Sequence, residues 1–234
     1  MRNLLVFLVV LATTACDNIW DCRKGEGPVV TQTLGLDEFN SIKLSGSGKV
    51  YISQGEVQEV QVEGQQNMID NLNLRIRDGH WDIRFLDCTR SHKELIFYIT
   101  VPEINALEIS GSGDIIGENM LITDNMDIEI SGSGKVSADV TANSLSMRID
   151  GSGDIWLAGE SEFADLRISG SGNLNAYDLE VDTYDIRITG SGGAKVTALE
   201  ALDVNITGSG SVSYQGTPTI NSSITGSGKV VSRN

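Results

Sequence analysis

The chain has 234 residues, with 32 acidic against 17 basic side chains and a formal net charge of −15. A surface of this charge repels phosphate backbones and anionic lipid headgroups, which argues against nucleic acid as a partner but leaves cationic ligands and divalent ions open. Apolar residues make up 40% and aromatic residues only 6% of the chain, so we expect a mainly aliphatic core.

The first residues are typical of an export signal. Residues 4–11 form an unbroken apolar run, which is too short to span a bilayer as a helix and fits the apolar core of a signal peptide over residues 1–15. Small residues then lead to Cys16, which resembles the lipid-attachment motif of bacterial lipoproteins. Thr13 stands where that motif usually has Leu, so ordinary cleavage after Ala15, leaving Cys16 without lipid, is the alternative.

Lipidation would hold the protein at a membrane through its N-terminus, since each buried methylene contributes about 0.8 kcal/mol. Residues 16–30 would then form a tether. We therefore expect an exported protein of Gram-negative type, lipid-anchored at the outer membrane and facing either the cell surface or the periplasm.

The three cysteines fit this picture. If Cys16 carries lipid, Cys22 and Cys88 remain as an even pair, and an oxidising compartment permits a disulfide between them; the alternative is two unrelated thiols. His80 and His92 lie far from any second metal-ligand pattern. We therefore expect neither a metal site nor a cofactor.

A repeat dominates the sequence. The tripeptide Gly-Ser-Gly begins at Gly46, Gly111, Gly132, Gly151, Gly170, Gly190, Gly208 and Gly226. From Gly111 onward the spacings are 21, 19, 19, 20, 18 and 18 residues. Glycine permits the backbone conformations of a sharp corner, and a flexible linker would not keep this period.

Aliphatic residues flank each corner at every second position. Two residues before the first glycine stand Leu44, Ile109, Ile130, Ile149, Ile168, Ile188, Ile206 and Ile224. Such alternation indicates β-strands with one buried face, and a single repeat can bury that face only by stacking on its neighbours. The sequence predicts an all-β, parallel solenoid with about 18–21 residues per coil, regular over residues 103–234.

The segment before the regular repeats is irregular. Apolar alternation on both sides of Asp78-Gly79 predicts a hairpin, and residues 65–71 suit a short helix or a loop. We interpret residues 31–102 as degenerate coils that cap the N-terminal edge of the same domain.

The outward-facing positions offer candidate ligand contacts. Arg148 and Arg167 stack in one column with Asp165 close by, which indicates a solvated ion-pair ladder or, alternatively, a site for an anion or a sugar. Trp156 should point outward, with Tyr177 one coil further on, so these aromatic rings are candidates for binding a sugar or a partner chain. Packing against loop residues is the alternative for both rings.

Three segments carry a resemblance to a known family. They are FNSIKLSGSGKVYISQG at residues 39–55, LRIRDGHWDIRF at 74–85 and YITVPEINALEISGSGDI at 98–115. Together with the later Gly-Ser-Gly coils they resemble the head GIN-domain family, described as "putative autotransporter adhesins", over residues 30–232. The resemblance implies a right-handed parallel β-helix similar to pectin lyase without its catalytic residues. It also implies a cell-envelope lipoprotein, with adhesion inferred for the family.

Three functions remain to be compared. The first is a non-enzymatic adhesion or ligand-binding module for a glycan or a protein, and the second is a structural or signalling spacer. The third is a polysaccharide-active enzyme, which we disfavour because the acids recur in columns without a unique pair of distinct environments. Asp114 and Asp154 follow corner glycines, but Lys49 and Lys135 replace them in other coils, which argues against a repeated calcium site.

Overall fold

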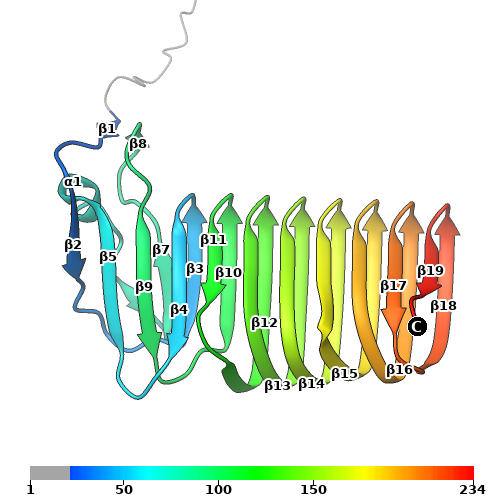
Figure 1. Cartoon of the computed structure of the whole chain (residues 1–234). Helices are drawn as coiled ribbons and strands as arrows, with labels where there is room; N and C mark the ends of the chain where they lie inside the picture. Colours follow the sequence, from blue (N-terminus) through cyan, green and yellow to red (C-terminus); the bar gives the residue numbers. More distant parts are fainter. Residues whose placement is uncertain (1–21) are drawn as a thin grey trace, which may run out of the picture.

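The computed structural model describes residues 22–234. The signal peptide predicted over residues 1–15 and the predicted lipid-attachment residue Cys16 lie outside the described residues. From Cys22 onward the chain forms an elongated β-solenoid with an irregular N-terminal end (Figure 1). This confirms the prediction of an all-β, parallel solenoid.

Five long strands make the regular part of the solenoid. They are β12 (Leu121–Gly132), β13 (Lys135–Gly151), β14 (Asp154–Gly170), β15 (Asn173–Gly190) and β16 (Gly193–Gly208). Each pairs in parallel with the next, so that Gly132, Gly151 and Gly170 stand in one register column. A Gly-Ser-Gly corner separates successive strands, and these corners form the narrow upper edge in Figure 1.

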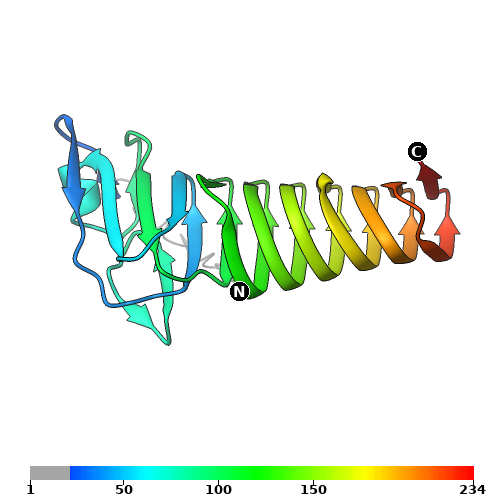
Figure 2. The same cartoon turned by 60° about the horizontal axis from the view of Figure 1, so that its bottom comes forward.

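Each coil contributes to two layers (Figures 1 and 2). We call the strand halves that lead into a corner the entry layer; they include residues 126–132, 145–151, 164–170, 184–190 and 202–208. The halves that leave a corner form the exit layer; they include residues 135–140, 154–159, 173–179 and 193–198. The aliphatic columns of both layers point inward and form one core.

The corner glycines are required by close stacking. Gly151 has a φ of +128°, and a Cβ there would lie 2.4 Å from the carbonyl oxygen of Gly132 in the coil before. The next residue, Ser152, donates its backbone N–H to that same oxygen at 2.8 Å. The corner of one coil therefore lies directly on the corner of the coil before it, and only a residue without a Cβ allows this close approach.

The order of the first coils in space differs from their order in the sequence. The coil made of β3 (Ser41–Gly46) and β4 (Lys49–Gln54) pairs on one side with β10 (Ala106–Gly111) and β11 (Asp114–Gly117). On its other side it pairs with β7 (His80–Ile83) and β9 (Ile96–Val101). The chain therefore leaves the stack after Gln54, builds the outer end, and crosses back over its own first coil.

The outer end combines short strands with one helical turn. It contains β1 (Arg23–Lys24), β2 (Val29–Thr33), β5 (Glu59–Gln65), α1 (Gln66–Ile69), β6 (Ile76–Arg77) and β8 (Thr89–Arg90). The antiparallel pair of β6 and β7 confirms the predicted hairpin, and α1 shows that the segment at 65–71 includes a helix. Trp81 is fully buried here between Phe39 and Phe97, and its indole N–H donates to the carbonyl of Asn73 at 2.8 Å. A disulfide joins Cys22 to Cys88, with the Cα atoms 4.8 Å apart.

The last coil differs from the aliphatic pattern. It consists of β17 (Ser211–Gln215), β18 (Thr219–Gly226) and β19 (Lys229–Ser232). Ile224, which belongs to the predicted interior column, is exposed, and Val230 is only half-buried. Prediction and structure differ here because no further coil covers β18 among residues 22–234.

Candidate functional site

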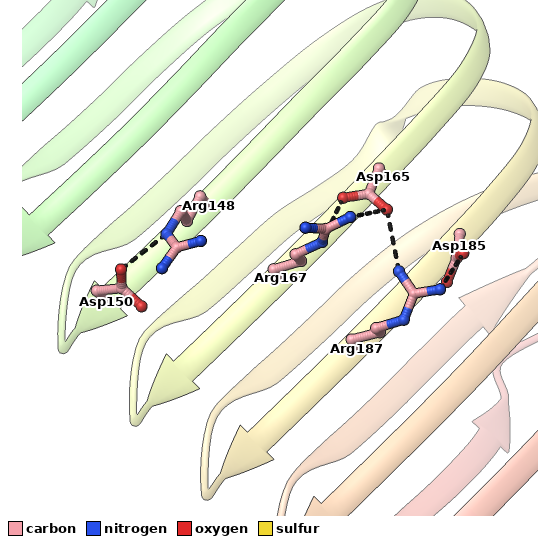
Figure 3. Close-up of polar contacts among 6 residues, drawn as sticks. All are labelled: Arg148, Asp150, Asp165, Arg167, Asp185 and Arg187. Carbon is pink, nitrogen blue, oxygen red and sulfur yellow. Dashed lines mark hydrogen bonds and ion pairs between the residues drawn. The ribbon is translucent and has the colours of Figure 1, made fainter.

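The arginine column lies on the entry layer. Arg148, Arg167 and Arg187 are direct register partners in successive coils (Figure 3). Arg148 pairs with Asp150, Nε to Oδ2, at 2.8 Å. Asp165 accepts from Arg167 at 3.0 Å and from Arg187 at 3.3 Å, and Asp185 pairs with Arg187 at 2.8 Å.

These ion pairs leave the column close to neutral, with three guanidinium groups against three carboxylates (Figure 3). The hydrogen bond from Arg148 to Asp150, reinforced by the charge of that carboxylate, raises the pKa of the guanidinium further above its ordinary value. The arginines are therefore engaged within the protein, which favours the predicted ion-pair ladder over an anion site.

The aromatic candidates lie on the other layer. Trp156 is 45% exposed, as expected for an outward position, and the Lys135 ammonium lies 5.0 Å from the centroid of its ring. Tyr177 is half-buried where the register slips between Ala176 and Glu180. The Thr197 hydroxyl fixes this irregular segment by donating to the Tyr177 carbonyl at 2.7 Å.

The four candidate contacts therefore do not form one site. Arg148 precedes the corner at Gly151 and Trp156 follows it, so the corner reverses the chain between them. The two layers lie face to face in a flattened solenoid (Figures 1 and 2). Because both layers turn their aliphatic columns toward the shared core, their outward side chains point to opposite sides. The structure pairs Trp156 with neighbours of the exit layer and stacks Arg148 with Arg167 on the entry layer.

A third surface lies where each coil passes from the exit layer back to the entry layer, at the bottom of Figure 1. We call it the return edge; it comprises residues 55–58, 102–104, 121–124, 141–143, 160–163, 180–183 and 199–201. It carries eight acids, namely Glu56, Glu103, Asp124, Glu160, Glu162, Glu180, Asp182 and Glu200, and no Lys or Arg. The outer faces of the layers mix both signs of charge, whereas this edge has only one.

The return edge is hollowed. A groove of about 690 Å³ crosses β12 to β16 and is lined by Glu160, Glu162, Glu180 and Asp182 among other residues. Ile122 and Leu199 line it and are 61% and 41% exposed, and Phe163, which follows the lining residue Glu162, is 40% exposed. Glu103 lines both this groove and a second hollow of about 400 Å³ toward the outer end. The edge therefore presents two adjoining hollows, each lined by carboxylates and at least one exposed apolar side chain.

The carboxylates of the groove repel one another. Glu160 and Glu180 are direct register partners, and neighbouring parallel strands lie about 4.8 Å apart. The Asn143 amide donates to Asp124 at 3.1 Å, but within residues 22–234 no acid lining the groove forms an ion pair. Like charges in register destabilise a sheet, so these acids reduce the stability of the fold instead of supporting it.

The acids of this edge form no column that can be detected in the sequence, because their spacing from the corners is irregular. The register slips between Trp156 and Ala158, and again after Ala176 and Val181, so acids that are neighbours in space do not keep one offset from the corners. The detectable signal is compositional, since every segment between an exit half and the next entry half lacks Lys and Arg.

The shape and charge of the edge suit the binding of a partner. Glu160, Glu162 and Glu180 are solvent-exposed and Asp182 is half-buried beside them, so none lies in the buried, apolar setting that a general-acid carboxyl group of a glycoside hydrolase requires. In the part of the chain that the structure describes, no three His, Cys, Asp or Glu side chains are grouped closely enough to hold a metal ion. No helix among the same residues is long and apolar enough to cross a bilayer.

Comparison with known proteins gives the family. A family model described as "Putative auto-transporter adhesin, head GIN domain" matches residues 38–218. The chain belongs to the head GIN-domain family. A crystal structure from Bacteroides fragilis, named a "putative adhesin", is 29% identical, with a TM-score of 0.85 over 90% of this chain and 100% of that one.

Two further crystal structures share the head GIN fold. A "putative adhesin" from Parabacteroides merdae is 25% identical, with a TM-score of 0.70, 92% of this chain and 100% of that chain covered. A "putative lipid binding protein" from Parabacteroides distasonis is 24% identical, with a TM-score of 0.76, 91% of this chain and 99% of that chain covered. No curated protein matches this head GIN chain. The structures from B. fragilis and P. merdae are both named as adhesins, and neither name is that of an enzyme.

Proposed function

We propose that this head GIN domain is a non-enzymatic adhesion module of the cell envelope that binds a protein or a glycan through its return edge. The proposal is supported by membership of a family named for adhesins. The observation that carries it is the open groove, in which exposed apolar side chains stand beside carboxylates that have no ion-pair partner within residues 22–234.

The other two surfaces fit this role less well. The arginines of the entry layer are engaged by aspartates, and the exposed ring of Trp156 is covered by the ammonium of Lys135. A partner would have to break these contacts before binding. On the return edge, a partner would instead bury Ile122, Phe163 and Leu199, and burying apolar side chains is favourable at about 25 cal/mol per Å².

The proposal includes the membrane as a partner through the N-terminus. The sequence supports export by a signal peptide over residues 1–15 and lipid attachment at Cys16, with the outer membrane as destination. The intact mass of the mature protein tests this, because a diacylated N-terminal cysteine is expected. A mass that matches the unmodified chain would remove the anchor from the proposal.

Binding is tested with the full chain lacking the signal peptide and carrying Cys16→Ser to keep it soluble. The protein is applied to a glycan array and to a panel of purified surface proteins. We expect capture that is lost in the double variant Ile122→Ser, Phe163→Ser. The matched control is Trp156→Ser, which removes an exposed aromatic side chain from the exit layer and should leave capture intact.

Three results would contradict the proposal. Capture that survives the double variant would move the binding surface elsewhere. If the protein binds nothing on the glycan array or the protein panel, a role as a structural spacer would be favoured. Turnover of a labelled polysaccharide by the purified chain would restore the enzyme hypothesis.

A further inference from the structure

The return edge constrains the chemistry of its occupant. It presents eight acids and no base, and the acids at the centre of the groove come from two adjacent coils. An anionic glycan or nucleic acid would be repelled, and a neutral glycan would leave the mutual repulsion of the carboxylates unrelieved. A second copy of this chain brings a net charge of −15 to the same surface. An occupant that complements the charge of the return edge must therefore be positively charged.

The apolar side chains exclude a simple ion as the complete ligand. Ile122 on β12 and Leu199 on β16 line the groove at the first and last strands that it crosses, and the exposed Phe163 on β14 lies next to the lining residue Glu162. A bare cation would leave all three in water. An occupant that satisfies both features must carry positive charges and apolar groups together over the same distance.

The length of the groove suits a short extended peptide. From β12 to β16 there are four strand spacings of about 4.8 Å, or about 19 Å in total. An extended chain rises about 3.3 Å per residue, so about six residues span this distance. Lys or Arg side chains of such a segment can reach the acids while its apolar side chains cover Ile122 and Leu199.

We propose that the return edge is the docking groove for an extended, cationic polypeptide segment in which Lys or Arg alternates with apolar residues. This inference rests on the proposed function and names the class of partner for the same surface. The binding energy comes from two sources, relief of carboxylate repulsion and burial of the apolar side chains.

The experiment measures the affinity of fluorescent peptides by anisotropy at two salt concentrations, with the full chain lacking the signal peptide. The main probe is an eight-residue peptide of alternating Lys and Leu. One comparison peptide has Glu in place of Lys, and another has Ser in place of Leu. We expect the Lys/Leu peptide to bind at least tenfold more tightly than either comparison, and to weaken at high salt.

Two matched protein variants locate the site. The edge variant carries Glu160→Gln, Glu162→Gln, Glu180→Gln and Asp182→Asn, and should weaken binding of the Lys/Leu peptide at least tenfold. The control variant carries Glu26→Gln, Glu59→Gln, Glu63→Gln and Asp70→Asn at the outer end, and should change affinity less than threefold. Both variants remove four negative charges, so a general effect of net charge would weaken them equally. Thermal unfolding by circular dichroism verifies that both variants are folded.

Several results would overturn the inference. Equal weakening in the two variants would mean non-specific attraction. Equal affinity for the Ser-containing peptide would mean that the apolar side chains take no part. If calcium chloride displaces the peptide and binds the wild type but not the edge variant, the edge is an ion site. If a glycan is captured through Phe163 while no cationic peptide binds, the inference fails and the proposed adhesion function stands.

Discussion

At the scale of single residues, the core contains one conspicuous polar atom. Tyr184 is completely buried on the entry layer, and among residues 22–234 its hydroxyl is a buried side-chain group without a hydrogen-bond partner. Burial raises the pKa of this phenol far above its ordinary value. A buried polar group that makes no hydrogen bond destabilises the folded state, because it forfeits its hydrogen bonds to water.

We expect Tyr184→Phe to raise the free energy of unfolding by about 1 kcal/mol, since it removes the unpaired hydroxyl and keeps the ring. Chemical denaturation near pH 7 measures this, with Tyr177→Phe as the control because Tyr177 is only half-buried. A loss of stability in Tyr184→Phe would show that the hydroxyl has a favourable contact.

Because of the buried Tyr184 phenol, we also expect the stability of the fold to depend on pH in the alkaline range. The folded state holds the phenol proton to a higher pH than the unfolded state, whose tyrosine titrates near pH 10. Above pH 10 the unfolded state therefore binds fewer protons, and stability falls by up to about 1.4 kcal/mol per pH unit from this group. Tyr184→Phe should show a shallower loss between pH 10 and 11, and parallel curves would contradict the assignment.

At the scale of elements, neighbouring parallel strands carry two opposite arrangements of acids. On the entry layer Asp165 lies between Arg167 and Arg187 and accepts from both. On the return edge Glu180 stands in register with Glu160, and no ion pair involves either of them among the described residues. The charges therefore stabilise the pairing of coils on the entry layer and destabilise it on the return edge.

Two single-charge variants should consequently change stability in opposite directions. We expect Glu180→Gln to raise the free energy of unfolding by about 0.2–1 kcal/mol and Asp165→Asn to lower it by a similar amount. Both remove one negative charge, so each is the control for the other. Thermal unfolding at low salt measures the difference, which should shrink in 1 M NaCl because both effects are screened. Shifts of the same sign would refute the distinction between the two surfaces.

Charges kept at a cost to stability are common at binding surfaces, because selection for function tolerates local destabilisation. If the edge served only to keep the protein soluble, acids spaced apart would do so with less repulsion. The stacked arrangement of Glu160 with Glu180 therefore agrees with the proposed use of the edge to bind a cationic partner.

At the scale of the whole molecule, the outer end depends on ties between distant parts of the chain. The disulfide between Cys22 and Cys88 closes a loop with a sequence separation of 66, and an ion pair between Arg23 and Asp87 lies beside it at 2.7 Å. In the chain-entropy model such a loop contributes about 4 kcal/mol by restricting the unfolded state.

We therefore expect reduction to destabilise the protein by up to about 4 kcal/mol, seen as a lower unfolding midpoint with dithiothreitol than without it. The double variant Cys22→Ser, Cys88→Ser should have the lower midpoint under both conditions. A wild-type midpoint that does not respond to dithiothreitol would show that the two thiols are not joined in solution.

The regular coils could be predicted because the residues that specify each coil lie close together in the sequence and recur in every repeat. Ile149, Ile168 and Ile188 each precede a corner by two residues, and stacking identical units buries all of them in one column. The hairpin at Asp78-Gly79 could be predicted for the same reason, since its turn residues lie between the two strands that they join.

The order of the first coils could not be predicted from such local patterns. The sequence of residues 41–54 does not indicate that this coil lies between the strands at residues 80–101 and those at residues 106–117. Both neighbouring coils present similar aliphatic columns, so either could pair with it. The chain's path over its own first coil follows from which strands pair, and strand pairing is a contact between distant segments.

For function, the sequence by itself determined the two-residue alternation, the glycine corners and the outward position of Trp156, because each follows from a strand's period and a corner's geometry. Only the tertiary structure decided that Trp156 and Arg148 face opposite sides, since the corner at Gly151 places them in different layers that share one core. It also decided that Glu160, Glu180 and Leu199 line one groove, because stacking aligns coils of unequal length whose acids share no fixed spacing in the chain.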